Sequence, residues 1–560
     1  MAELVLGPLL RHLTDHSVTV WVETDAACEV DILGRTARTF SVHGHHYALV
    51  VVDGLEPGSR QEYQVRLDAR VAWPEPDSSY PPSLLRTLAP GRSQRLVFGS
   101  CRHATPKALS LGYEPDALDT YAQRMATEDP DQWPDAVLLL GDQVYADNTS
   151  PRTQEFIKGR RSVSEPPYLE VSDYEEYTAL YRESWSDPDI RWLLANVPSA
   201  MIFDDHDVRD DWNTSYAWRR EIESTPWWRD RIIGGLASYW VYQHLGNLSP
   251  DALAADPMWQ AVQASGQDAA PLLERLAAQA DGEVDDGRQN GGTRWSYRID
   301  YGRTRLVVVD TRCGRVLTAD DRAMMSDAEF DWLAEQFAGD YDHLLIASSL
   351  PWLLPWAIHH VEAWNEALCA GARGPRLARF GENVRRAGDL EHWAAFQASF
   401  ERLGRLLAEV SRGERGPRPA SVSVLSGDVH HAYVAQATFD PPGQTPVYQL
   451  VVSPVHQTVP AMIKVGFTVG WSRLAAALAR PAARWAKVPR SAVRWTRTAG
   501  PFYGNELGTL LIDGRAARFS LERARRTSGA PARLVTVNQT PLAWRDGAAD
   551  APAAALPIPN

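Results

Sequence analysis

Reactive side chains stand directly after two short apolar runs of this sequence. Cys101 ends the run RLVFGSC, and Asp142 ends the run AVLLLGD, with Tyr145 three residues further along. A lone carboxylate at such a place is often a turn or capping residue, and a lone cysteine is usually a small core residue. Cys101 differs from the other three cysteines because it stands at the same kind of position as the acidic residues, which suggests a chemical role.

Two further clusters combine aspartate with histidine. In DDHD (204–207) three carboxylates flank His206, an arrangement that is costly without metal ions or arginine partners. In SGDVHH, Asp428 and His430 are two residues apart, and on an extended segment this spacing points both side chains to one face. That pair suits a shared metal ion, whereas His431 would face the other way and have a supporting or structural role.

Short apolar runs separated by helical stretches are typical of the buried strands of an α/β fold. Six runs have this character: 95–101, 136–142, 199–207, 305–312, 343–349 and 421–428. In open α/β sheets, ligands bind beyond the carboxyl ends of the strands. The four clusters end four of these runs, so we expect them to meet at one edge of the fold.

The first part of the chain has a different texture. From Val18 to about Thr87 the sequence alternates β-branched residues with polar ones, and Gly/Pro turns separate the short runs. This pattern predicts a small antiparallel β-sandwich over residues 1–90. The stretch GLEPGSRQEYQVRL resembles one corner of fibronectin type III modules, so we expect a fibronectin type III-like domain here.

The four clusters together resemble the motifs of the PhoD-like (alkaline phosphatase D) family of calcineurin-like metallophosphatases. They occur in the family's order: GSC (99–101), GDQVY (141–145), DDHD (204–207) and SGDVHH (426–431). The resemblance covers roughly Arg95 to Pro454. It implies an α/β (α+β) protein with a metallophosphatase αββα sandwich, which we place at residues 93–458, and hydrolysis of phosphate mono- or diesters, including phospholipase D-like diester cleavage.

The resemblance also implies a dinuclear metal centre. Its four ligands to a ferric iron would be Cys101, Asp142, Tyr145 and His430. Asp142 would bridge to a second ion, whose site Asp205 and Asp428 complete. Three anionic ligands suit a trivalent ion, whereas oxygen ligands suit Ca²⁺, our first choice, or Mn²⁺ or Mg²⁺. Two such ions would hold a hydroxide for in-line attack at phosphorus.

Three more residues receive roles next to this centre. His206 matches the family's motif histidine, and we expect it to act in catalysis beside Asp142, by stabilising the transition state or protonating the leaving group. Arg102 and Arg209 flank two of the motifs and are predicted to bind phosphate oxygens of the substrate. Salt bridges to the surplus aspartates are the alternative for both arginines.

The segment 459–502 stands apart because residues 459–500 contain eight basic and no acidic residues, interleaved with three tryptophans. The spacing of its cations predicts helical structure broken near Pro481 and Pro489. Three roles are open: an amphipathic lid with its basic face in water, a surface that guides anionic substrates, and peripheral contact with a membrane or anionic lipid.

The rest of the chain receives simpler predictions. Residues 251–293 would be an insertion that passes from an Ala-rich helical stretch to a flexible loop. Residues 503–545 would add C-terminal strands to the metallophosphatase domain, and residues 546–560 would be a flexible tail.

Composition limits the function classes. The net charge of −14 argues against stable nucleic-acid binding, and four widely spaced cysteines form neither a zinc-finger nor a redox motif. No signal peptide, twin-arginine signal or membrane-spanning segment is evident, so we expect a cytoplasmic protein. The competing hypothesis is a non-catalytic protein that binds a partner or a membrane and whose metal centre is structural or degenerate.

Overall fold

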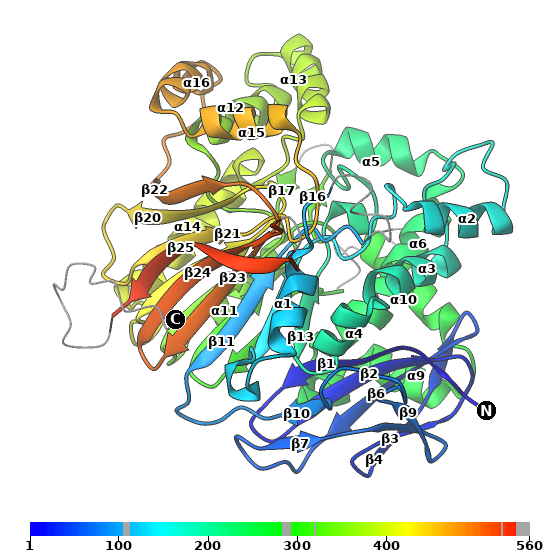
Figure 1. Cartoon of the computed structure of the whole chain (residues 1–560). Coiled ribbons are helices and arrows are strands. Elements are labelled where there is room, and N and C mark those ends of the chain that lie inside the picture. Colours follow the sequence, from blue (N-terminus) through cyan, green and yellow to red (C-terminus); the bar gives the residue numbers. More distant parts are fainter. Residues whose placement is uncertain (105–112, 283–292, 319–320, 528–529, 545–560) are drawn as a thin grey trace.

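Two mixed β-sheets form the centre of the molecule in the computed structural model, which describes residues 1–104, 113–282, 293–318, 321–527 and 530–544 (Figure 1). The six-stranded sheet has the order β13 (Ser199–Ile202), β12 (Ala136–Leu140), β11 (Gln94–Gly99), β23 (Glu506–Asp513), β24 (Ala516–Arg525) and β25 (Arg533–Ala543). The seven-stranded sheet has the order β14 (Tyr297–Tyr301), β15 (Thr304–Val308), β18 (His343–Ala347), β19 (Ser421–Ser426), β21 (Val447–Val451), β20 (Ala432–Phe439) and β22 (Val493–Phe502).

All six predicted apolar runs form strands of these sheets. In the first sheet β11, β12 and β13 are parallel, and in the second β15, β18, β19 and β21 are parallel. Every residue of β12, β13, β15, β18 and β19 is buried, which explains why none of these strands alternates buried with exposed residues.

The two sheets approach closely where β11 and β19 end. A Cβ atom added to Gly427 would lie 1.9 Å from the Cβ atom of Ser100, and 3.3 Å from the carbonyl oxygen of Leu140. Only a residue without a side chain fits between these strands. The close approach brings the loop after β19 against the loops after β11 and β12.

Helices cover the sheets. Side chains cap several of their first turns, with Ser150, Asp173 and Ser326 accepting backbone N–H groups of α2, α3 and α11. The helices outside the 250–281 and 459–502 segments are α1 (Ala117–Met125), α2 (Pro151–Arg160), α3 (Tyr174–Trp185), α4 (Pro188–Leu194), α5 (Tyr216–Glu223), α6 (Trp228–Tyr239), α7 (Leu245–Asn247), α11 (Asp327–Gln336), α12 (Trp356–Cys369), α13 (Pro375–Ala387) and α14 (Gln397–Arg412). Within the described ranges, no helix is both long and apolar enough to cross a membrane.

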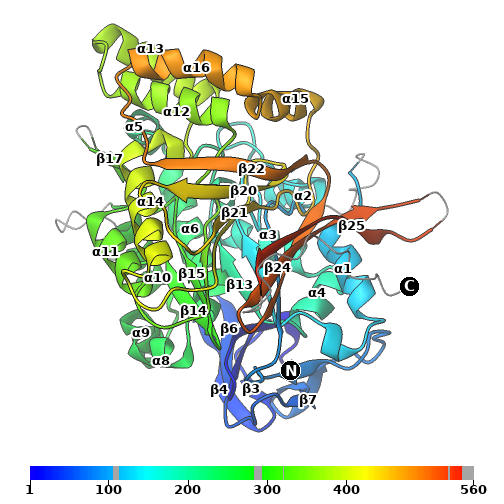
Figure 2. The same ribbon diagram turned by 90° about the vertical axis from the view of Figure 1, so that its left-hand side faces the viewer.

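The N-terminal region is entirely β. Its two four-stranded sheets are β1 (Leu4–Leu13), β2 (Val18–Thr24), β6 (His45–Val52) and β5 (Phe40–Val42), and β4 (Arg35–Arg38), β3 (Glu29–Ile32), β8 (Val65–Leu67) and β9 (Arg70–Trp73); β10 (Leu84–Arg86) pairs with β7 (Arg60–Glu62). The region lies at the lower end of the molecule in both views (Figures 1 and 2). Buried Arg11 ties it to the rest of the chain by donating to the carbonyl oxygens of Tyr242 and Gln243.

The segment 250–281 is helical and packs beside this β region. It contains α8 (Pro250–Ala255), α9 (Pro257–Ser265) and α10 (Ala270–Asp281). The Asp268 carboxylate accepts the backbone N–H groups of His43 and Gly44, so the segment is joined to the β region. Most of the loop predicted to follow, residues 283–292, lies outside the described residues, as does the tail predicted at 546–560.

The prediction that 459–502 is helical throughout is wrong for its last part. The segment contains α15 (Ala461–Gly470) and α16 (Arg473–Trp485), but Val493–Phe502 form the edge strand β22, paired with β20. In β22 the more buried residues are Val493, Trp495 and Arg497, and the residues between them are exposed. This alternation has the two-residue period of a strand. The predicted break at Pro481 is also absent, because Pro481 lies within α16.

Candidate metal centre

The predicted ligands come together beyond the carboxyl ends of four strands. Cys101 follows β11, Asp142 follows β12, Asp205 follows β13, and Asp428 and His430 follow β19. The backbone φ angles of Cys101, Asp428 and His430 are 59°, 62° and 49°. Left-handed backbone is uncommon in residues other than glycine and gathers at functional sites. Asp428 to His430 therefore form a turn, and the extended conformation predicted for them is wrong.

Among the described residues, two groups of side chains have ligand atoms close enough to share an ion. The first contains Asp142, Asp205 and His206, and the second contains Asp204, Asp205 and Asp428. Within each group the ligand atoms lie within 4.8 Å of one another. Because Asp205 belongs to both groups, the two potential sites are adjacent.

Two carboxylate oxygens in this cluster are buried and unpaired. Within the described part of the chain, Asp142 Oδ1 and Asp204 Oδ2 make no hydrogen bond. Burial, reinforced by neighbouring aspartates, raises the pKa of Asp142 well above its usual range. Buried oxygen atoms without partners are costly, and a bound cation would both pair them and favour the ionised carboxylate. These residues therefore fit a metal site.

Cys101 lies at the base of the same cluster. Its Sγ atom is 3.2 Å from Ser100 Oγ, and it accepts a hydrogen bond from Ser453 Oγ at 3.3 Å. Burial raises the pKa of the Cys101 thiol, and the charges of Asp142 and Asp428 raise it further. A thiolate at this position consequently needs a cation beside it.

The imidazole of His430 is neutral in this environment. Burial lowers its pKa, and neutral imidazole is the form that binds metals. The neighbouring His431 is fully buried, and its Nδ1 atom pairs with the carbonyl oxygen of Val429 at 2.7 Å. The His431 ring also packs against the rings of Tyr433, Phe467 and Tyr503.

A fully buried arginine that the sequence analysis missed stands among the carboxylates. Arg312 Nε donates to Asp204 Oδ1 at 2.5 Å, and Arg312 Nη2 lies 3.4 Å from Asp205 Oδ1 and 3.7 Å from Asp428 Oδ1. Its Nη1 atom lies 2.6 Å from Glu391 Oε1. Arg312 neutralises part of the acidic cluster. It follows β15, so the strand-end rule that selected the aspartates would have found it.

His392 is a second residue that the sequence analysis missed. Its Nε2 atom lies 2.8 Å from Asp428 Oδ2, and its Nδ1 atom lies 2.7 Å from Glu362 Oε1. This chain of hydrogen bonds fixes the orientation of the Asp428 carboxylate. No local pattern in the sequence marks His392, because it lies in a loop 36 residues before its partner.

His206 is held by a carboxylate that also was not anticipated. Its Nδ1 atom lies 2.8 and 3.0 Å from the two carboxylate oxygens of Asp147. Burial alone would lower the pKa of His206, but Asp147 and Asp205 outweigh it and raise that pKa well above its ordinary value. Burial likewise opposes ionisation of Asp147, yet His206 brings its pKa down to about 2. The Asp147 carboxylate therefore favours the protonated form of the His206 imidazole at the edge of the cluster.

The two arginines predicted to bind phosphate form salt bridges instead. Arg102 is buried, with Nε 2.8 Å from Asp116 Oδ2 and Nη2 3.2 Å from Asp119 Oδ1, and it also donates to the carbonyl oxygen of Ser184. Arg209 Nη1 lies 3.0 Å from Glu170 Oε2. Both arginines thus form salt bridges, the alternative to phosphate binding, but their partners are Asp116, Asp119 and Glu170 and not the surplus aspartates of the motifs.

Comparison with known proteins follows the same division of the chain. Residues 100–490 match the family described as PhoD-like phosphatase, and residues 1–85 match a family described as a domain of unknown function, DUF7800. No curated protein matches the chain.

Two solved structures are similar. One titled "Structure of PhoD" has a TM-score of 0.56 at 13% sequence identity, covering 96% of this chain and 92% of that chain, which shows a shared fold. A purple acid phosphatase PPD1 from yellow lupin (Lupinus luteus) seeds has a TM-score of 0.44 at 11% identity, covering 94% of this chain and 74% of that chain.

Proposed function

Because the chain belongs to the PhoD-like phosphatase family and is therefore a phosphoric-ester hydrolase, we propose that it cleaves phosphate mono- and diesters at a dinuclear metal centre. The observation that carries this proposal is the pair of buried, unpaired carboxylate oxygens Asp142 Oδ1 and Asp204 Oδ2. Among the described residues these acceptors have no partner, and a cation would supply one.

The donor set supports two different ions. Cys101, Asp142 and Tyr145 offer three anionic ligands, and His430 offers a neutral imidazole, which together suit Fe³⁺. Asp205 and Asp428 offer oxygen ligands next to Asp142, which suit a hard divalent ion, with Ca²⁺ preferred over Mn²⁺ or Mg²⁺. When bound, such a pair of ions activates water and neutralises charge that develops on the phosphoryl oxygens.

The chain's own residues prepare this chemistry. Arg312 and His392 hold the carboxylates of Asp205 and Asp428 in fixed orientations, so the site is formed before substrate enters. His206, kept protonated by Asp147, stabilises charge on the ester and donates its Nε2 proton to the departing oxygen. The leaving group then departs as a neutral alcohol and not as an alkoxide ion.

The N-terminal β region is proposed to be a fibronectin type III-like sandwich. Two four-stranded antiparallel sheets and a shared apolar core support this assignment. The region shares its core with the six-stranded sheet, so its proposed role is to brace the phosphatase fold.

Replacement of Asp142 by Asn tests the proposed centre. The variant should lose hydrolysis of both bis(p-nitrophenyl) phosphate and p-nitrophenyl phosphate, and metal analysis should show less bound metal, because Asp142 is the ligand that we propose for both ions. Asp15→Asn, on the exposed surface of the β region, is the matched control and should behave like the unmodified protein. Near-normal turnover by Asp142→Asn would refute the proposal.

The iron assignment has a separate test. Protein purified with its native metals should contain iron and absorb visible light through charge transfer from the Tyr145 phenolate or the Cys101 thiolate. Tyr145→Phe should shift or remove the phenolate band. Protein that is active but contains no iron and shows no such band would refute the iron assignment while leaving the phosphoesterase assignment intact.

A further inference from the structure

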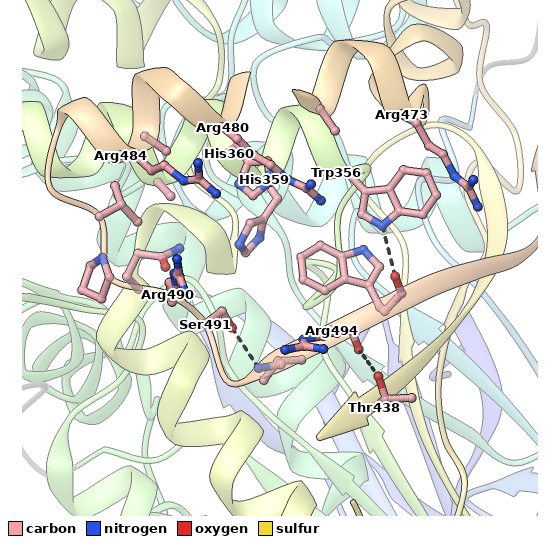
Figure 3. A pocket seen from close by; sticks show the side chains of 18 of the residues that line it. Trp356, His359, His360, Thr438, Arg473, Arg480, Arg484, Arg490, Ser491 and Arg494 are labelled. Carbon is pink, nitrogen blue, oxygen red and sulfur yellow. Dashed lines mark hydrogen bonds between the residues drawn. The ribbon is translucent and has the colours of Figure 1, made fainter. Parts of the chain in front are cut away.

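A basic groove lies between α12, α16 and β22 (Figure 3). Its volume is about 830 Å³, and Trp356 and Trp495 form part of its wall. Five arginines line it: Arg473, Arg480, Arg484, Arg490 and Arg494. No aspartate or glutamate is among the lining residues. The groove therefore concentrates positive charge on a protein whose net charge is −14.

The arginines of the groove are not neutralised by any carboxylate among the residues that the structure describes. In the described part of the chain, none of the five forms an ion pair with a carboxylate; Arg480 Nε donates instead to His360 Nε2 at 3.1 Å. Burial together with Arg480 and Arg484 lowers the pKa of His360 to about 4, so this histidine accepts the hydrogen bond as a neutral ring. The groove is thus a site for a polyanionic ligand.

The two helices of this region also expose apolar side chains. On α16, Leu474 and Leu478 are 70% and 72% exposed and lie one helical turn apart, and neither lines the groove. On α15, Met462, Val465 and Val469 are 82%, 63% and 53% exposed. Both views place α15 and α16 at the end of the molecule opposite the N-terminal β region (Figures 1 and 2).

We propose that α15, α16 and the arginine groove form a docking surface for a bilayer that contains anionic phospholipid. The arginines would bind headgroup phosphates, and the leucines of α16 with the apolar residues of α15 would enter the interface between headgroups and acyl chains. A soluble polyphosphate or a nucleic acid would fill the groove but leave these apolar side chains in water. An anionic lipid surface offers phosphates to the arginines and an apolar layer to the exposed leucines.

The proposed surface is connected to the metal centre through α15. The ring of Phe467 on this helix lies 4.3 Å, centroid to centroid, from the ring of His431, which adjoins the predicted ligand His430. The inference does not rest on the proposed phosphoesterase activity, since it concerns side chains outside the metal centre.

Vesicle co-sedimentation of the full-length protein tests the proposal. Protein should bind vesicles of phosphatidylcholine with one-third phosphatidylglycerol, should not bind phosphatidylcholine alone, and should bind less as salt rises. Arg480→Gln with Arg484→Gln should weaken binding about 25-fold, from the usual contribution of each basic residue near an anionic membrane. Leu474→Ser with Leu478→Ser should weaken it about tenfold or more, because both side chains lose their apolar surroundings.

Controls separate docking from unfolding and from general charge effects. Arg38→Gln and Leu33→Ser change exposed residues of the β region and should leave binding unchanged. All variants should hydrolyse a small soluble ester at the unmodified rate, which shows that they are folded. Absence of binding to anionic vesicles at low salt would overturn the proposal. A second result would also overturn it: the arginine variant loses vesicle binding, the leucine variant keeps it, and inorganic tripolyphosphate binds the leucine variant as well as it binds the unmodified protein. The groove would then be a site for soluble anions.

Discussion

Replacement of Asp147 by Asn tests how the acidic cluster uses its histidine. Asp147 accepts the His206 Nδ1–H group at 2.8 Å, and this is the contact that keeps the imidazole protonated and aimed. A hydrogen bond between charged groups contributes about 1.5–3 kcal/mol. If this hydrogen bond stabilises the transition state for departure of the leaving oxygen by that amount, loss of the bond should slow hydrolysis about 10- to 150-fold.

The assay compares two esters that differ only in the leaving group. Phenol leaves with difficulty and benefits from a proton donor, whereas p-nitrophenol leaves readily without one. Asp147→Asn should therefore lower kcat/KM for phenyl phosphate by the full factor and for p-nitrophenyl phosphate by only a few-fold. A variant that has simply lost its active-site structure would lose both activities equally.

A neighbouring carboxylate provides the matched control. Asp210 Oδ1 lies 3.8 Å from His206 Nε2, but its side chain is 68% exposed. Exposed ion pairs contribute little, so Asp210→Asn should change either rate by less than about fivefold. Equal losses on both esters in Asp147→Asn, with bound metal retained, would refute the proton-donor role of His206.

Three further predictions concern the framework. Arg102→Met should lower the free energy of unfolding by about 3–5 kcal/mol, because Asp116 loses its buried partner. The KM should stay unchanged. A raised KM at unchanged stability would instead support the predicted binding of phosphate by Arg102. His244, buried with a pKa lowered to about 3 by burial, must stay neutral in the fold, so its contribution to stability is complete above pH 6.5 and is lost as pH falls toward 3. Urea unfolding should therefore show that the free energy of unfolding of His244→Phe, relative to that of the unmodified protein, is about 2 kcal/mol higher at pH 5 than at pH 7.5. The same relative free energy at both pH values would contradict this. Gly427→Ala would press against Ser100 and should reduce bound iron; full metal content would show that the loops tolerate the added methyl group.

Much of the fold follows from local patterns. Apolar runs too short for helices predicted β11, β12 and β19, because strands buried on both faces have no polar side to alternate. The edge strand β22 was missed, since its arginines and tryptophans have spacings that also suit a helix, and only pairing with β20 decides between the two.

The candidate site divides in the same way. Cys101, Asp142 and Asp205 stand at strand ends, and the sequence alone indicates that such positions meet at one edge of the fold. Arg312 and Asp147 contact the site residues across 108 and 59 residues of chain, so their roles depend on how the loops fold together.

The sequence by itself determined which chemistry this protein carries, because residue types and their places after buried strands are local properties. Only the tertiary structure decided which charged side chains form ion pairs with one another. It buried Arg102 against Asp116, placed Arg312 among the aspartates, and left five arginines of the 459–502 segment facing a groove with no carboxylate among its described lining residues. Electrostatic energy depends on distance and burial, neither of which can be read from positions along the chain.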